Sequence, residues 1–135
     1  MIKACAKPRR DHDGTWITGE MQNAYIQLHE LGIAHSLEVW ADDDLAGGIY
    51  GLALGKVFFG ESMFSDTQDA SKIALVALCH QLQQWKFTAM DCQVSNPHLL
   101  SMGAVEISRE EFENHLQDTN CPDQWKPDFS HASHW

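Results

Sequence analysis

Apolar residues recur at helical spacing in two stretches of the chain. The first stripe comprises Met21, Ala24, Tyr25, Leu28 and Leu31. Because Thr18 precedes it and Gly32 follows it, the pattern predicts a helix capped by the threonine and ended by the glycine. The second stretch, residues 69–85, predicts the longest helix of the chain. Its expected inner face consists of Ile73, Ala74, Ala77, Leu78, Leu82 and Trp85.

Between these predicted helices, alternating apolar and polar positions indicate strands. Residues 34–40, 45–54 and 57–61 are expected to form an antiparallel meander with turns at 42–44 and 55–56. Three glycines, Gly47, Gly48 and Gly51, fall in the middle strand. Glycine weakens a strand, so their presence predicts a close backbone approach or a bulge.

The remaining pattern follows the long helix. Residues 87–94 predict a central strand, and Asn96 with Pro97 predicts the start of a short helix that stops at Gly103. Residues 105–107 are expected to form a brief strand, followed by a helix opened by the capping box 108–111. The whole order predicts a mixed α+β layer: a meander, a crossover helix, and a strand beside it.

Length and charge narrow the function classes. A chain of 135 residues suits one domain with a real core. Its formal net charge of -10 argues against a general nucleic-acid coat, since phosphate binding draws on Lys and Arg. An acidic surface suits a cationic substrate better. No stretch has the length and apolar character of a membrane span, and the first residues lack the core of a secretory signal, so a cytoplasmic protein is expected.

The cysteines and histidines show no metal-binding or disulfide pattern. Cys5, Cys79, Cys92 and Cys121 contain no CxxC pair and are expected to be buried free thiols. The histidines form no HxxxH or HExxH pattern, so no metal site is expected. The sequence also lacks the Gly-x-Ser-x-Gly elbow of a serine nucleophile.

Chemically able side chains stand at the ends of two predicted strands. Glu61 ends the third strand of the meander, and Asp91 and Gln93 lie two residues apart near the end of the strand after the long helix. Alternation along a strand would put Asp91 and Gln93 on one face. The pattern therefore predicts a cleft in which carboxylates converge on a substrate. Simpler interpretations remain open: Asp91 as a carboxylate that caps a turn, Gln93 as a structural hydrogen bonder, and Glu61 as a surface charge.

Several short segments stand in the order found in one family. They are Thr15-Trp16-Ile17-Thr18, Leu28-His29-Glu30-Leu31-Gly32, Ala34-His35-Ser36-Leu37-Glu38-Val39-Trp40, Gly47-Gly48-Ile49-Tyr50-Gly51, Gly60-Glu61-Ser62-Met63-Phe64-Ser65, Ala70-Ser71-Lys72, Asp91-Cys92-Gln93-Val94 and Met102-Gly103-Ala104. Over roughly residues 14 to 112 the chain resembles the leucyl/phenylalanyl-tRNA–protein transferase family. The resemblance implies an acetyltransferase-like (GNAT) fold, formed here by residues 14–117, with 1–13 a leader or the remnant of a preceding domain and 118–135 a tail.

The same resemblance implies an activity and its partners. Leu or Phe would be transferred from an aminoacyl-tRNA to proteins with an N-terminal Arg or Lys, which marks them for degradation in bacteria. The tRNA ester is already activated, so the reaction needs no cofactor. Asp91 is expected to orient the incoming amine and accept its proton, and Gln93 to bind the amine or the ester. By resemblance, Glu61 and Asp91 also read the cationic side chain of the acceptor.

The transferred side chain needs an apolar slot. The candidates, for each of which ordinary core packing is the alternative, are Trp16, Ile49, Phe58, Met63, Leu75, Leu78 and Leu82. Leu82 stands where the family is expected to have an aromatic residue, which predicts a deeper slot and an effect of Leu82→Phe on donor choice. Asn96 and Ser101 are candidates for contact with the terminal adenosine, although Asn96 could simply cap its helix.

Two other functions remain in competition. An acyl-CoA N-acetyltransferase would have a glycine-rich pyrophosphate loop at the start of the long helix, but residues 65–71 contain no glycine and carry Asp66 and Asp69. The other alternative is a module that binds N-terminal Arg or Lys without transferring anything. Family members usually carry an additional N-terminal domain that helps to grip the tRNA, and the chain is expected to begin about where that domain ends.

Overall fold

A four-stranded sheet forms the centre of the molecule. The computed structural model describes residues 1–7, 17–120 and 125–129, and in these residues the strand order is β1-β2-β3-β4. Strands β1 (Ala34–Ala41), β2 (Asp44–Leu54) and β3 (Val57–Ser65) pair antiparallel, and β4 (Ala89–Asp91) pairs parallel with β3. The mixed α+β class, the meander and the strand placed beside it by a crossover helix are therefore confirmed.

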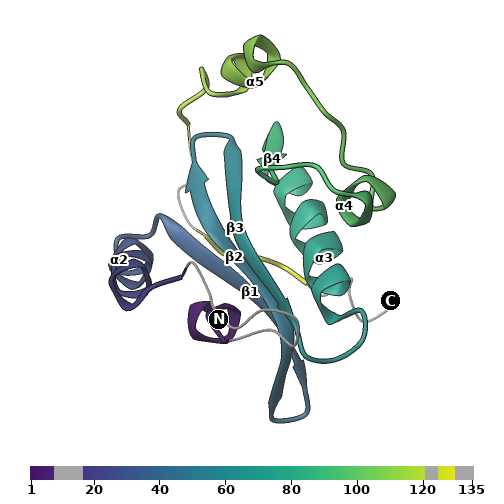
Figure 1. The fold of residues 1–135 in the computed structure, drawn as a ribbon. Helices are drawn as coiled ribbons and strands as arrows, with labels where there is room; N and C mark the ends of the chain where they lie inside the picture. Colours follow the sequence, from purple (N-terminus) through teal and green to yellow (C-terminus); the bar gives the residue numbers. More distant parts are fainter. Residues whose placement is uncertain (8–16, 121–124, 130–135) are drawn as a thin grey trace.

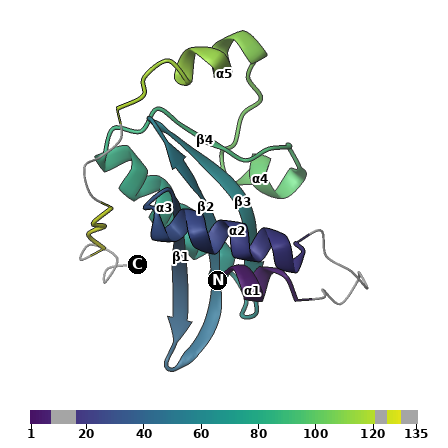
Figure 2. The same ribbon diagram turned by 90° about the vertical axis from the view of Figure 1, so that its left-hand side faces the viewer.

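Helices cover both faces of the sheet (Figures 1 and 2). Helix α3 (Ala70–Gln84) packs on one face, and α1 (Ile2–Cys5) and α2 (Gly19–Glu30) lie on the opposite face. After β4 come α4 (Pro97–Ser101) and α5 (Arg109–His115), and α5 extends past the end of the sheet in both views. Among the described residues, no helix combines the length and the apolar character needed to cross a bilayer.

The predicted boundaries of α2 are confirmed. Thr18 Oγ1 accepts a hydrogen bond from the Met21 N–H at 3.2 Å, so the threonine satisfies an orphan donor of the first turn. At the other end, Gly32 has a φ of 78° and the Ile33 N–H donates to the Leu28 carbonyl at 2.9 Å. This left-handed glycine with a bond back into the last turn closes the helix.

The two faces of the sheet are packed differently. On the α3 face, a large apolar cluster is buried, formed by Ile49, Phe58, Ala74, Leu75, Leu78, Leu82 and Leu99. On the opposite face, a smaller cluster contains Cys5, Ile17 and Tyr50. The inner stripe predicted for α3 is confirmed except at Ile73, whose side chain is exposed.

Strand β2 shows both features predicted from its glycines. A Cβ added to Gly51 would lie 2.7 Å from Phe58 Cε1, so only glycine lets the neighbouring strand approach this closely. The pairing of β2 with β3 also shifts next to this position: Tyr50 pairs with Ser62, and Gly51 pairs with Gly60. Glu61 is therefore the extra residue of a β-bulge, a distortion that redirects side chains.

Three predictions about strands were wrong in extent or position. Residues 87–94 do not form a central strand: β4 contains only three residues, lies at the edge of the sheet, and ends where Gln93 adopts a left-handed φ of 69°. Residues 105–107 form no strand, since among the described residues these exposed positions join no sheet ladder. Strand β3 is longer than expected and continues past Glu61 to Ser65.

The cysteine prediction is partly confirmed. Cys5, Cys79 and Cys92 are free thiols. Cys5 is buried and Cys92 is half-buried, but Cys79 is exposed, with its Sγ 3.9 Å from Met90 Sδ of β4. Cys121 lies outside the described residues.

Part of the segment after α5 packs back onto the sheet. The Trp125 ring stacks on His35, with centroids 3.9 Å apart and planes within 4°, and meets Trp85 edge-on at 4.7 Å. The Asp128 N–H donates to Gln81 Oε1 at 2.8 Å, which satisfies a buried side-chain amide. Residues 125–129 are thus anchored to the end of α3 and to β1.

Candidate functional site

A groove of about 1260 Å³ runs along β3 where β4 no longer covers it. Strand β4 stops at Asp91, which pairs with Phe59, whereas β3 continues for six more residues to Ser65. The groove is lined by this part of β3, by the residues that follow β4, by the start of α3 and α4, and by α1. The early end of the last strand therefore creates the opening.

Glu61 and Gln93 meet at this groove and both line it. Gln93 Nε2 donates to Glu61 Oε2 at 3.4 Å, across 32 positions of sequence. The bulge in β3 presents Glu61 at this point, and the left-handed backbone after β4 presents Gln93. Two of the three polar residues predicted from the strand ends are thus brought together.

Asp91 is placed behind this pair. Its Oδ1 accepts a hydrogen bond from the Gln93 N–H at 2.8 Å, so the carboxylate holds the turn that carries Gln93. Asp91 is half-buried and does not line the groove. The prediction that Asp91 and Gln93 share a strand face was wrong, because the strand ends at Asp91. The turn-capping interpretation of Asp91 is confirmed.

Asp91 and Glu61 nevertheless lie on the same side of the sheet. Phe58 belongs to the cluster under α3, so its neighbour Phe59 points to the other side. Asp91 pairs with Phe59 in register and shares that side. Glu61 also faces it, since the Glu61 carboxylate is close enough to Tyr25 of α2 to help raise the pKa of that tyrosine.

The partner of Gln93 fixes the orientation of its amide. An ionised carboxylate only accepts hydrogen bonds, so the NH₂ group must face Glu61. The Gln93 carbonyl oxygen is then turned away from Glu61 and remains an acceptor. A carboxylate and an amide oxygen together can bind a protonated amine.

Only some of the predicted apolar residues reach the groove. Ile49, Met63 and Leu75 line it. Phe58, Leu78 and Leu82 do not line it and belong to the core under α3, which was the stated alternative for each. Ile49 and Leu75 are members of the same buried cluster, at 2% and 6% exposed, so both also pack in the core. Trp16 lies outside the described residues.

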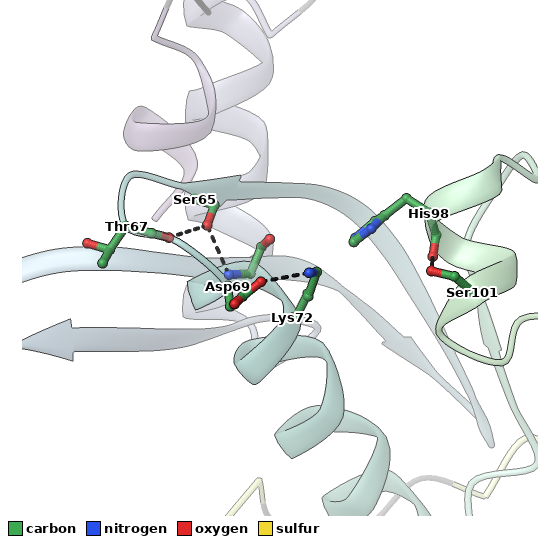
Figure 3. Close-up of polar contacts among 7 residues, drawn as sticks. Ser65, Thr67, Asp69, Lys72, His98 and Ser101 are labelled. Atoms are coloured by element: carbon green, nitrogen blue, oxygen red, sulfur yellow. Dashed lines mark hydrogen bonds and ion pairs between the residues drawn. The ribbon is translucent and has the colours of Figure 1, made fainter.

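Asn96 and Ser101 have different positions. Asn96 lines the groove, and its Oδ1 accepts from the Leu99 N–H at 2.8 Å, which confirms the helix cap. Ser101 does not line the groove, and its hydroxyl donates to the His98 carbonyl at 2.6 Å within α4 (Figure 3).

The start of α3 forms one end of the groove, opposite His98 of α4 (Figure 3). Ser65 Oγ accepts from the Ser71 N–H at 3.2 Å and donates to the Thr67 carbonyl at 2.8 Å. Lys72 forms an ion pair with Asp69 at 2.6 Å. Amide and ammonium donors that a pyrophosphate would use are therefore occupied by the chain itself.

The Cys92 thiol, which lines the groove, lacks the environment of a nucleophile. Burial, followed by the charge of Asp91, raises the pKa of the Cys92 thiol, which keeps it protonated at neutral pH. In the part of the chain that the structure describes, no three His, Cys, Asp or Glu side chains gather as metal ligands would.

Sequence patterns did not identify two polar residues at or near the site. His98 lines the groove from α4, and Tyr25 of α2 lies near Glu61. Burial first, and then the hydrogen bond to Glu61, raise the pKa of Tyr25 to about 12. Tyr25 was assigned to the apolar stripe of its helix, and only its hydroxyl hinted at a polar contact.

The chain is similar in sequence to known proteins of one family. Residues 1–117 match the family model described as leucyl/phenylalanyl-tRNA protein transferase. Curated proteins with the name leucyl/phenylalanyl-tRNA–protein transferase are similar to the chain. The protein from Hydrogenovibrio crunogenus is 60% identical over 130 residues, and that from Saccharophagus degradans is 55% identical over 119 residues. The protein from Nitrosomonas europaea is 52% identical over 135 residues.

These matches cover most of the chain but only part of each relative. They include 93%, 88% and 97% of the chain, against 51%, 49% and 57% of the three relatives. The chain thus spans about half the length of the curated relatives it matches. It belongs to the leucyl/phenylalanyl-tRNA protein transferase family.

Proposed function

We propose that the chain provides the acyl-transfer site of an aminoacyltransferase that moves Leu or Phe from aminoacyl-tRNA to the N-terminal Arg or Lys of acceptor proteins. The observation that carries this proposal is the meeting of Glu61 and Gln93 in a groove that also contains Ile49, Met63 and Leu75. Cationic and apolar groups can be bound there side by side. The name shared by the relatives supports the choice of donor.

The chemistry is aminolysis of an ester. The α-amine of the acceptor attacks the ester carbonyl, a C–N bond forms, and the C–O bond to the ribose breaks. The neutral amine loses one proton as the C–N bond forms, and the ribose oxygen takes up one proton as it leaves. Alignment of amine and carbonyl supplies much of the rate.

The residues of the groove fit distinct parts of this reaction. The Glu61 carboxylate attracts the cationic acceptor, and the Gln93 carbonyl oxygen accepts a hydrogen bond from its amine. Asp91 acts through Gln93, because it holds the turn on which Gln93 stands. Ile49, Met63 and Leu75 offer apolar contacts to the Leu or Phe side chain. The transferred group would then lie on the α3 side and the acceptor on the α2 side.

The arrangement of the sheet supports an acetyltransferase-like (GNAT) fold for residues 14–117. A bulged strand followed by a crossover helix and a short parallel strand opens the sheet at one edge, and an acyl donor fits such an opening. The occupied donors at the start of α3 favour an aminoacyl ester over acyl-CoA, since a pyrophosphate would compete with Ser65 and Asp69.

One assay separates the three candidate functions. The chain is incubated with Phe-tRNA and a peptide that begins with Arg, and the mass of the peptide is followed. An increase by one Phe residue supports aminoacyl transfer. Peptide binding without a mass change supports a recognition module, and acetylation of the peptide in the presence of acetyl-CoA supports an acetyltransferase. The same peptide with an acetylated N-terminus is the control.

A further inference from the structure

The chain between β4 and α5 forms one wall of the groove. It leaves the sheet after Asp91, turns at Gln93 and continues into α4. The groove-lining residues that follow the turn are Val94, Asn96, Pro97, His98 and Leu99. None of these residues belongs to a strand, so the position of the wall depends on contacts outside the sheet ladder.

A hydrogen bond ties the two ends of this segment together. Ser95 Oγ donates to Glu106 Oε1 at 2.6 Å, across 11 positions of sequence. A hydroxyl-to-carboxylate bond of this length is charge-assisted and is stronger than a bond between neutral groups. Residues 95–106 therefore form a loop whose ends are in contact, and compact surface loops of about 6–16 residues with this property frequently carry function. Both side chains are exposed, so water competes for the bond.

The middle of the loop is held from the inside. Leu99 is 6% exposed and belongs to the buried cluster under α3, together with the groove residue Leu75. Asn96 caps α4, and the Ala104 N–H donates to the Leu99 carbonyl at 3.1 Å where the helix ends. These contacts fix α4 within the loop. The bond between the loop ends fixes its base, next to the turn that follows β4.

We propose that Glu106 is a positioning residue for the aminoacyl donor: its carboxylate holds the Ser95 hydroxyl and so keeps the loop 95–106 where it forms the donor side of the groove. The inference rests on the proposed function, because it concerns the same groove. Glu106 does not line the groove and acts through Ser95 on Asn96 and His98, which do. Since Leu99 packs under α3, the loop borders the side assigned to the transferred Leu or Phe.

The charge of Glu106 and its hydrogen bond act on donor binding in opposite directions. A carboxylate repels the phosphates of tRNA, so loss of the charge alone should strengthen binding, whereas loss of the hydrogen bond should weaken it. Glu106→Gln removes the charge but keeps an oxygen that can accept from Ser95, and Glu106→Ala removes both. Glu113 on α5 offers a matched control, since its exposed carboxylate pairs with Arg109 at 4.0 Å and does not line the groove.

The experiment compares the full chain with the variants Ser95→Ala, Glu106→Ala, Glu106→Gln, Glu113→Gln, and Ser95→Ala combined with Glu106→Ala. For each, kcat and the separate KM values for Phe-tRNA and for a peptide that begins with Arg are measured. The ¹H–¹⁵N signals of the Asn96 side-chain amide are recorded in parallel. Urea unfolding monitors the fold, so that a folding defect is recognised.

For Ser95→Ala and Glu106→Ala we expect the KM for Phe-tRNA to rise about fivefold, the size expected for loss of one hydrogen bond for which water competes, with smaller changes in kcat and in the KM for the Arg peptide. The combined variant should rise no further, since the two residues act as one unit. Glu106→Gln and Glu113→Gln should show no rise. The Asn96 amide signal should move in the alanine variants and stay in place in the two glutamine variants.

Four results would overturn the positioning role: an unchanged KM for Phe-tRNA in Glu106→Ala, an equal rise in Glu106→Gln, full additivity in the combined variant, or an equal rise of KM for both substrates. If the unsubstituted chain transfers nothing and binds no Arg peptide, the proposed function fails instead. The hold of Glu106 on the loop is then decided by the Asn96 amide signal alone, whose displacement in Glu106→Ala supports it and whose constancy refutes it.

Discussion

The two faces of the sheet carry different kinds of side chains, although the same strands form both faces. Under α3 the face is mainly apolar, with Gln81 as a buried polar residue, and Phe58, Leu78 and Leu82 are almost fully buried. The face under α2 carries Tyr25, Tyr50 and Glu61, whose polar groups lie close to one another. The groove opens at the edge where the faces meet. The difference separates residues that hold the fold from residues that can do chemistry.

The strongest test of this separation removes a residue from the α3 face. Phe58→Ala should lower the free energy of unfolding by about 3–5 kcal/mol, because it leaves a cavity in a packed core. Urea unfolding measures the loss. A variant that unfolds at the original urea concentration but no longer transfers Phe would instead place Phe58 in the substrate slot and break the comparison.

A substitution on the polar face should instead reduce activity and leave stability nearly unchanged. Glu61→Gln removes the charge and keeps the shape, so transfer to a peptide that begins with Arg should fall about 10- to 100-fold, the loss expected when a hydrogen-bonded contact with a charged group, worth about 1.5–3 kcal/mol, is removed. The free energy of unfolding should change by less than about 1 kcal/mol, since Glu61 is only half-buried. Steady-state kinetics and urea unfolding are both needed, and a large loss of stability with unchanged kinetics would contradict the assignment.

Leu82 tests the boundary of the apolar core. Because Leu82 is 3% exposed and lies away from the groove, Leu82→Phe should cost about 1–3 kcal/mol through overpacking. The preference between Leu-tRNA and Phe-tRNA should stay the same in a competition assay. A shift toward Leu would restore the interpretation of Leu82 as the floor of a donor slot. Leu75→Phe, in the groove, is the positive control.

A substitution at Gln93 is expected to raise the stability of the chain and lower its transfer activity. Its left-handed backbone costs a residue with a side chain about 1 kcal/mol relative to glycine. Gln93→Gly should therefore raise the urea midpoint slightly while it abolishes most of the transfer. If Gln93→Ala is as stable as Gln93→Gly, backbone strain is not the cause.

The smallest expected effect is a pH dependence far from the groove. Burial, as the main cause, lowers the pKa of His35 below 6.5. The unfolded chain therefore binds a proton more readily at this position, and stability should decline as the pH falls below about 6.5. Urea unfolding at pH 7.5 and 5.5 measures the decline. His35→Gln keeps a donor toward the Gly32 carbonyl and should reduce the decline; an equal decline would assign it to other groups.

Local patterns were enough to predict most of the elements. Caps at Thr18 and Asn96 and the turn at Gly55 are signals within a few residues, and each appears in the structure. The apolar period of α3 likewise depends only on its own residues. The short length of β4 does not: its end is set by the left-handed Gln93 and by the hydrogen bond from Asp91.

The candidate site was predicted only in part, because some of its residues give a local signal in the sequence and others depend on distant contacts. Glu61 and Gln93 were found because polar residues at strand ends are conspicuous. Tyr25 was not, because a tyrosine in an apolar stripe looks like core, and its contact depends on how α2 packs across the sheet. Phe58, Leu78 and Leu82 were named as slot residues because sequence order does not distinguish core from groove.

The stacking of Trp125 on His35 has a practical consequence for anyone who shortens this protein. A chain truncated after α5 would lose the Trp125 indole, which packs against Phe58, Trp85 and Phe87. The rings of these three residues would then be exposed to water. Such exposed rings favour association between molecules. A truncation should therefore be placed after Trp125, even though a chain that ends after α5 would keep every residue of the groove.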